Sequence, residues 1–120
     1  MASILAVDDS ASMRQMVAFT LKGAGHVVVE AADGDEALSI AREQAFDLVI
    51  TDVNMPNMDG ITLIKELRTL PNFKFTPLLM LTTESKNDKK QAGKEAGATG
   101  WIVKPFNPDQ LLATVSKVLG

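Results

Sequence analysis

Cysteine is absent from this sequence, and its absence excludes several kinds of chemistry. Without thiols the chain has no disulfides, no thiolate nucleophile and no sulfur ligand for a metal, a composition that fits a reducing compartment. Histidine is almost absent too, because the chain has only His26, which lies in a stretch typical of a β-strand. We expect His26 to be structural.

Long apolar runs and an excess of basic residues are also missing. No run approaches the length of a membrane-spanning helix, and the first residues lack the charged and then apolar layout of a signal peptide. With 12 basic and 15 acidic residues, the net charge of −3 gives no general attraction to nucleic acids or anionic membranes. We expect a soluble, cytoplasmic protein that neither binds nucleic acid nor inserts into a membrane.

Length and composition indicate one folded domain. The chain has 120 residues, and 46% of them are hydrophobic, which is enough to bury a single continuous core. No low-complexity tract, internal repeat or shift in composition marks a second domain. We expect residues 1–120 to form one monomeric domain whose output passes through another chain.

Short apolar and β-branched runs alternate with longer amphipathic segments. The predicted strands are Ser3–Val7, His26–Ala31, Leu48–Asp52, Leu78–Thr82 and Gly100–Val103. A helical pattern follows each strand, and several strands are continuously apolar, as is typical of strands buried on both faces of a parallel sheet. The sequence predicts an α/β fold of the flavodoxin-like class, a doubly wound five-stranded parallel sheet with five helices on both faces.

Two of the predicted helices differ in character. The last one has a clear apolar stripe, with Asn107 as its N-cap and Pro108 at its first helical position. The fourth, near Lys86–Ala96, has only alanines as apolar residues and an internal Gly93, which costs about 1 kcal/mol relative to alanine. We expect the fourth helix to be weakly anchored and mobile.

The carboxyl ends of the predicted strands carry the candidate functional groups. Asp8 and Asp9 end the first strand, and Asp52 ends the third. Thr82 ends the fourth strand, and Lys104 follows the fifth. Alone, each has a plainer interpretation, such as an N-cap, a strand former or a solvated loop residue. Because ligand sites of open parallel sheets form at this edge, their coincidence favours a functional site.

Three carboxylates at one edge indicate a bound cation. Two carboxylates about 4 Å apart repel by about 1 kcal/mol in water-like surroundings and by about 4 kcal/mol at an effective dielectric constant of about 20. Oxygen ligation without histidine or cysteine favours Mg²⁺, with Mn²⁺ as the alternative, over zinc. Such a site suits phosphoryl transfer, with Asp52 as nucleophile, Lys104 neutralising phosphoryl oxygens and Thr82 donating a hydrogen bond.

From Ile4 to Leu119 the chain resembles bacterial response-regulator receiver domains, most closely the stand-alone chemotaxis regulators of that family. The markers of the resemblance are Asp8-Asp9, the stretch from Asp52 to Gly60, Thr82 with its following loop, Gly97-Ala98 and Lys104-Pro105-Phe106. In the family the Lys-Pro peptide bond is typically cis, so the resemblance implies a cis bond between Lys104 and Pro105.

The resemblance implies a phosphoacceptor with a metal beside it. Asp52 would accept the phosphoryl group. Asp9 and Asp52 would bind Mg²⁺ directly, Asn54 would bind it through its backbone carbonyl, and Asp8 would act through water. The division of the metal ligands among Asp9, Asp52, Asn54 and Asp8 follows from the family resemblance.

The resemblance also implies a switch. Lys104 would pair with the phosphoryl group, and Thr82 would close onto a phosphoryl oxygen while Trp101 turns inward. Asn54 and Glu84 occupy positions that influence how water reaches the acyl phosphate, and this pair of amide and acid indicates fairly quick self-dephosphorylation.

The partners implied by the resemblance are proteins. They are a histidine kinase of the chemotaxis type as phosphodonor, an output protein such as a flagellar motor switch protein, and a phosphatase. A regulator of another pathway or a phosphate sink is the alternative. Our hypothesis for the partner surface combines Trp101, the fifth strand and the last helix with a basic face of Lys86, Lys90 and Lys94. That face would meet an acidic or amphipathic segment, whereas a solvated face is the plainer interpretation.

Two other classes of protein share parts of this pattern. Haloacid-dehalogenase-type phosphatases also use a strand-end aspartate and Mg²⁺, but they need an acid where this chain has Asn54, and room for a cap domain. Flavodoxin-like flavin binders need a hydroxyl-rich loop after the first strand, where Asp8 and Asp9 would repel phosphate without a metal. We therefore predict a switch that catalyses only its own phosphorylation and dephosphorylation.

Overall fold

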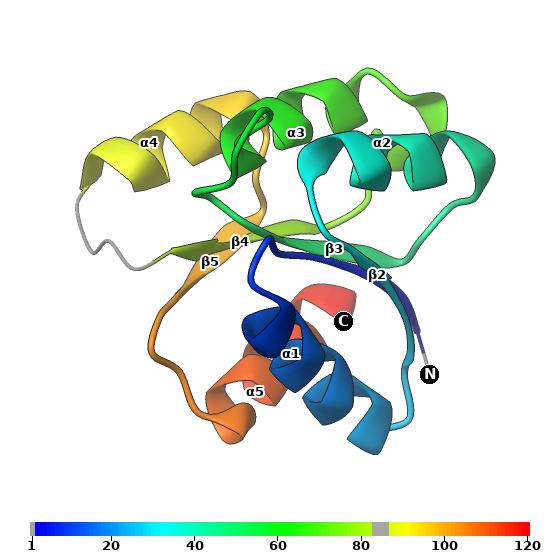
Figure 1. Ribbon diagram of the computed structural model, residues 1–120, viewed down its shortest axis with the longest axis vertical. Coiled ribbons are helices and arrows are strands. Elements are labelled where there is room, and N and C mark those ends of the chain that lie inside the picture. The colour runs from blue at the N-terminus through cyan, green and yellow to red at the C-terminus, as the bar shows by residue number, and fades with distance from the viewer. Residues whose placement is uncertain (1, 83–86) are drawn as a thin grey trace.

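A single five-stranded parallel sheet forms the centre of the molecule, with the strand order β2-β1-β3-β4-β5 (Figure 1). The computed structural model describes residues 2–82 and 87–120, with side chains for residues 2–82 and 91–120. The strands are β1 (Ser3–Val7), β2 (Val27–Ala31), β3 (Leu48–Asp52), β4 (Leu78–Thr82) and β5 (Gly100–Val103). The second strand begins one residue later than predicted, because the His26 N–H still bonds to the Leu21 carbonyl at the end of the preceding helix.

Helices cover both faces of the sheet, which confirms the doubly wound prediction (Figure 1). One face carries α2 (Gly34–Glu43), α3 (Gly60–Arg68) and α4 (Asn87–Ala96). The other face carries α1 (Ala11–Gly23) and α5 (Pro108–Leu119). A short 3-10 helix, η1 (Pro71–Phe73), precedes β4. Among the described helices, none combines the length and the apolar character needed to cross a membrane.

The core consists of two apolar layers, one on each face of the sheet. Leu5, Val49 and Leu78 point into the layer under α2 and α3, while Ile4 and Leu79 point into the layer under α1 and α5. Strands β3 and β4 are buried along their whole length, as their continuous apolar runs predicted. Within the described residues, the buried polar or charged side chains all lie at the carboxyl ends of strands: Asp8, Thr51, Asp52 and Thr82.

The start of α5 and the position of His26 agree with the sequence-based predictions. Helix α5 begins as predicted, because Asn107 Oδ1 accepts a hydrogen bond from the Gln110 N–H at 2.8 Å and Gln110 Oε1 accepts one from the Asn107 N–H at 3.0 Å. His26 is structural, as expected, since its Nδ1 accepts a hydrogen bond from the Ala2 N–H at 3.1 Å.

Helix α4 is attached to the sheet without an apolar stripe. A Cβ at Gly93 would overlap the end of the buried Met80 side chain, so the glycine lets α4 lie close to β4. Just beyond the helix, the Gly97 carbonyl accepts hydrogen bonds from Arg68 Nη2 at 2.7 Å and Arg68 Nε at 3.0 Å. Close backbone packing and these hydrogen bonds attach the C-terminal end of α4 to its neighbours. The weak anchoring and mobility expected for this helix stay a prediction.

Candidate functional site

Carboxylates from two neighbouring strands meet at the carboxyl edge of the sheet. Strands β1 and β3 are parallel and Val7 pairs with Thr51, so the residues that follow, Asp8 and Asp52, lie side by side. Asp8 and Asp52 are buried, whereas Asp9 is exposed. One carboxylate oxygen from each of the three lies within 4.8 Å of the others. The structure therefore brings together the acids that the sequence placed at one edge.

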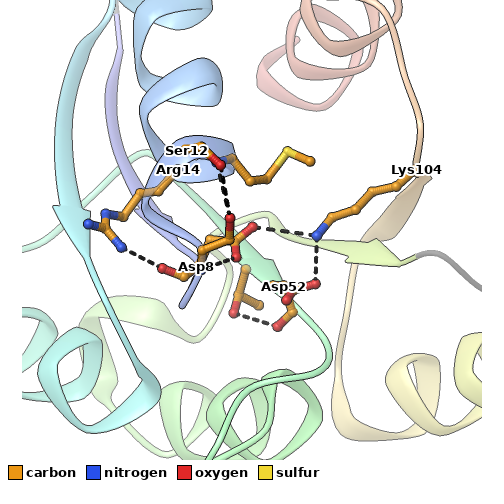
Figure 2. Close-up of polar contacts among 8 residues, drawn as sticks. Asp8, Ser12, Arg14, Asp52 and Lys104 are labelled. Atoms are coloured by element: carbon orange, nitrogen blue, oxygen red, sulfur yellow. Dashed lines mark hydrogen bonds and ion pairs between the residues drawn. The ribbon is translucent and has the colours of Figure 1, made fainter.

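Lys104 is the cation that reaches these acids. Its Nζ lies 3.0 Å from Asp52 Oδ1 and 3.5 Å from Asp8 Oδ2 (Figure 2). The exposed side-chain fractions are 12% for Lys104, 10% for Asp52 and 3% for Asp8, so both ion pairs are largely shielded from water. The Lys104 N–H donates to the Thr82 carbonyl at 2.7 Å, and the Lys104–Pro105 peptide bond is cis, as the resemblance implied.

Burial raises the pKa of the Asp8 carboxyl above its ordinary value. Loss of hydration is the largest cause, and the charge of Asp52 acts in the same direction. The Ser10 N–H, which donates to Asp8 Oδ1 at 2.9 Å, and the ammonium group of Lys104 act in the opposite direction. Lys104 therefore compensates only part of the unfavourable environment of an ionised Asp8.

The donor set fits a hard divalent cation. Asp8, Asp9 and Asp52 offer carboxylate oxygens only, and against one ammonium group their three charges leave a net −2. Mg²⁺ is bound in proteins by a few carboxylates together with water, and the exposed Asp9 gives this site a side open to solvent. Asn54 is exposed two residues after Asp52, and ligation through its carbonyl stays a prediction.

Thr82 and Trp101, the two residues predicted to switch, lie on adjacent strands. Thr82 is fully buried at the end of β4, where it pairs with Val103 of β5. Trp101 is 38% exposed and borders a groove of about 540 Å³ that Phe106 and Gln110 also line. Trp101 thus lies in an outward position here, and its inward turn stays a prediction.

The predicted basic face is only partly described. Lys94 is exposed on α4. Glu84, Lys86 and the side chain of Lys90 lie outside the described residues, so the predictions made for them stay predictions.

Sequence reasoning missed residues that hold the backbone of Asp52. A Cβ at Gly60, the first residue of α3, would overlap the Asp52 carbonyl oxygen, and the Gly60 N–H donates to the Val53 carbonyl at 2.9 Å. Thr51 Oγ1 donates to the Asp52 carbonyl at 3.0 Å. The available signal was the Asp59-Gly60 pair, which we included only in the family marker from Asp52 to Gly60.

Comparison with known proteins agrees with this geometry. A family model described as the response regulator receiver domain matches residues 4–116. Chemotaxis protein CheY-3 of Vibrio cholerae is 40% identical over 116 residues, which cover 96% of this chain and 89% of that protein. The probable transcriptional regulator ycf27 of Porphyridium aerugineum is 41% identical, but the chain spans about half of its length, 47%.

Solved structures agree over nearly the whole chain. Vibrio cholerae chemotaxis protein CheY4 has a TM-score of 0.96 and 58% identity, with 98% of each chain covered. The receiver domain of the sensor histidine kinase PA1611 from Pseudomonas aeruginosa has a TM-score of 0.92 and 26% identity, with 99% of this chain and 98% of that chain covered. That structure has a magnesium ion coordinated in its active site cleft.

Proposed function

This chain belongs to the response regulator receiver domain family, and from that membership we propose that it is a phosphorylation switch in which Asp52 is the phosphoacceptor. The observation that carries the proposal is the ammonium group of Lys104, 3.0 Å from Asp52 Oδ1, beside two further acids at the carboxyl edge of the sheet. The donor is a histidine kinase. The chain turns over no external substrate.

In the proposed transfer, an Asp52 carboxylate oxygen attacks the phosphorus atom of a phosphohistidine. The new O–P bond forms as the P–N bond breaks, and the departing imidazole takes up a proton. Lys104 pairs with a phosphoryl oxygen, and Thr82 donates a hydrogen bond to another. Mg²⁺, or Mn²⁺ in its place, neutralises phosphoryl oxygens when bound. Asp9, Asp52 and the Asn54 carbonyl would hold the ion, with Asp8 acting through water.

Water attack on the phosphorus atom returns the switch to its starting state. The O–P bond to Asp52 breaks, inorganic phosphate leaves, and the carboxylate is restored. Asn54 and Glu84 tune this hydrolysis by influencing how water reaches the acyl phosphate. Reset therefore needs no second protein, although a phosphatase can accelerate it.

The fluorescence of Trp101, the chain's single tryptophan, tests the acceptor assignment. We expect beryllofluoride or a small acyl phosphate, added with Mg²⁺, to change the emission of the wild type, and the acyl phosphate to add one phosphoryl group to its intact mass. Asp52→Asn abolishes both responses. The matched control Asp35→Asn, at an exposed site on α2, keeps them. A donor response that survives Asp52→Asn refutes the assignment.

The output surface lies around Trp101 in this proposal. Phosphorylation draws Thr82 toward the phosphoryl group and lets Trp101 turn inward, which reshapes the β5 and α5 surface. The grooves beside Trp101, of about 540 Å³ and 370 Å³, support this placement. An acidic or amphipathic partner segment binds there and to the predicted basic face of Lys86, Lys90 and Lys94. Unchanged partner affinity at low salt after reversal of these three lysines to glutamate would contradict the basic contact.

The pathway we propose is chemotaxis, with a CheA-like kinase as donor and a flagellar motor switch protein as output partner, in a cytoplasmic monomer. Support comes from the two Vibrio cholerae chemotaxis proteins, which match over nearly their whole lengths. The alternative is a regulator of another pathway or a phosphate sink. The match to the probable transcriptional regulator ycf27 favours a regulator of another pathway. Phosphorylation-dependent binding to a purified motor switch protein distinguishes the two.

A further inference from the structure

Arg14 is a largely buried cation next to the acidic site, and the proposed phosphoryl transfer does not use it. It lies near the start of α1, and its side chain is 17% exposed. Its Nη1 donates a hydrogen bond to the backbone carbonyl of Asp8 at 2.7 Å (Figure 2). Its Nε donates to Glu30 Oε1 at 3.3 Å. The guanidinium group thus holds the backbone that carries the acids.

The Asp8 carbonyl belongs to the peptide group that joins Asp8 to Asp9. Because a peptide group is planar, fixing its oxygen also fixes the direction in which the chain enters Asp9. On the other side, the Asp8 N–H donates to the Ala31 carbonyl at 3.2 Å. Hydrogen bonds therefore fix the backbone on both sides of the Asp8 Cα, and the one from Arg14 is the nearer to Asp9.

The position of the Asp9 carboxylate depends on this backbone hydrogen bond more than the positions of the Asp8 and Asp52 carboxylates do. The carboxylates of Asp8 and Asp52 are buried and paired with Lys104. The Asp9 side chain is exposed, and within residues 2–82 and 87–120 it makes no hydrogen bond. Its position beside the other acids is accordingly set by its backbone.

We propose that Arg14 is a positioning residue for the cation site: it orients the Asp8–Asp9 peptide group so that the Asp9 carboxylate joins Asp8 and Asp52. Glu30 holds the guanidinium group in this orientation from β2, where it pairs in register with Ala6 of β1. This inference rests on the metal site of the proposed function.

Positioning and simple charge effects predict opposite results. The guanidinium group is positive, so its removal strengthens cation binding if charge alone matters. If Arg14 orients Asp9, its removal weakens cation binding, as is usual when a group that orients a metal ligand is lost. The sign of the change in Mg²⁺ affinity therefore separates the two roles.

The test is calorimetric titration of Mg²⁺ into the wild type, Arg14→Gln, Arg14→Lys and the matched control Arg42→Gln, at an exposed site on α2. We expect Arg14→Gln to weaken Mg²⁺ binding about tenfold. Arg14→Lys keeps the charge and one donor, so it recovers part of the affinity. Arg42→Gln binds Mg²⁺ as the wild type does. Melting curves without Mg²⁺ verify that each variant is folded.

Equal or tighter Mg²⁺ binding by folded Arg14→Gln overturns the proposal, because Arg14 then acts only through charge or fold stability. If Arg14→Gln does not fold, Arg14→Lys decides, and wild-type affinity in that variant overturns the proposal. A wild type that binds no Mg²⁺ refutes the proposed metal site and this inference together. A wild type that binds Mg²⁺ with the same affinity as the Arg14 variants refutes this inference alone.

Discussion

Lys104 holds two buried carboxylates, Asp52 and Asp8, with one ammonium group at 3.0 Å and 3.5 Å. Breaking a shielded ion pair is more damaging than its net contribution suggests, because the remaining charge stays buried without a partner. A bound divalent cation at the same acids takes over part of the same task. Lys104 and Mg²⁺ would therefore compete in stabilising the site, although in the proposed function both serve the phosphoryl group.

Lys104→Met tests this competition. Without Mg²⁺ we expect the free energy of unfolding of the variant to fall by about 2 kcal/mol, because Asp8 and Asp52 lose the ammonium group that donates to both. Added Mg²⁺ then raises the melting temperature of Lys104→Met more than that of the wild type. Thermal unfolding with and without Mg²⁺ measures both effects.

Lys65→Met, at an exposed position on α3, is the control for loss of a lysine charge. It should change neither the stability nor the response to Mg²⁺. An equal Mg²⁺-induced shift in Lys104→Met and the wild type would show that the ammonium group and the cation do not share the same acids.

Helix α3 is placed against the end of β3 by a glycine. Its side chains Leu63, Ile64 and Leu67 are buried in the core, and its first residue, Gly60, touches the Asp52 carbonyl with its backbone. Backbone cannot move aside as a flexible side chain can, so this contact sets how closely α3 approaches Asp52. The helix thereby fixes the position of the Asp52 carbonyl.

Gly60→Ala should destabilise the protein although alanine is the better helix former. The added Cβ overlaps the Asp52 backbone oxygen, and we expect a loss of about 2–3 kcal/mol in the free energy of unfolding. The control is Gly23→Ala at the end of α1, where a Cβ meets nothing within 4 Å. This substitution should raise the free energy of unfolding by up to about 1 kcal/mol. Urea unfolding measures both. A Gly60→Ala variant as stable as the wild type contradicts the close approach.

At the scale of the whole molecule, sequence pattern was enough for the architecture. Continuous apolar runs such as Leu78–Thr82 predicted buried parallel strands, and the polar residues that end or follow four of the strands predicted the edge at which the three acids meet. Contacts between distant backbone and side-chain groups have no such pattern. Arg68 donates hydrogen bonds to the carbonyls of Gly97, Phe73 and Thr76, and Arg14 donates one to the Asp8 carbonyl. None of these hydrogen bonds follows a periodic pattern in the sequence.

The acidic site also links the stability of the whole fold to pH. The pKa of Asp8 is raised in the folded state, so the folded chain binds a proton more tightly than the unfolded chain does. The penalty from Asp8 is fully present above the raised pKa, shrinks as the pH falls through it, and is gone below the lower pKa of the unfolded chain. Without Mg²⁺, Asp8→Asn should therefore melt at a higher temperature than the wild type at neutral pH, and the difference should shrink on acidification.

Mg²⁺ should remove the same penalty at neutral pH by binding only the folded state. At a concentration of about 100 times its dissociation constant, a ligand of the folded state adds about 2.7 kcal/mol. We expect Mg²⁺ to raise the melting temperature of the wild type and to have a smaller effect on Asp8→Asn. Sodium chloride of equal ionic strength controls for screening of charges. If sodium chloride reproduces the full shift, or Asp8→Asn responds like the wild type, the acids relieve their repulsion without a specific cation site.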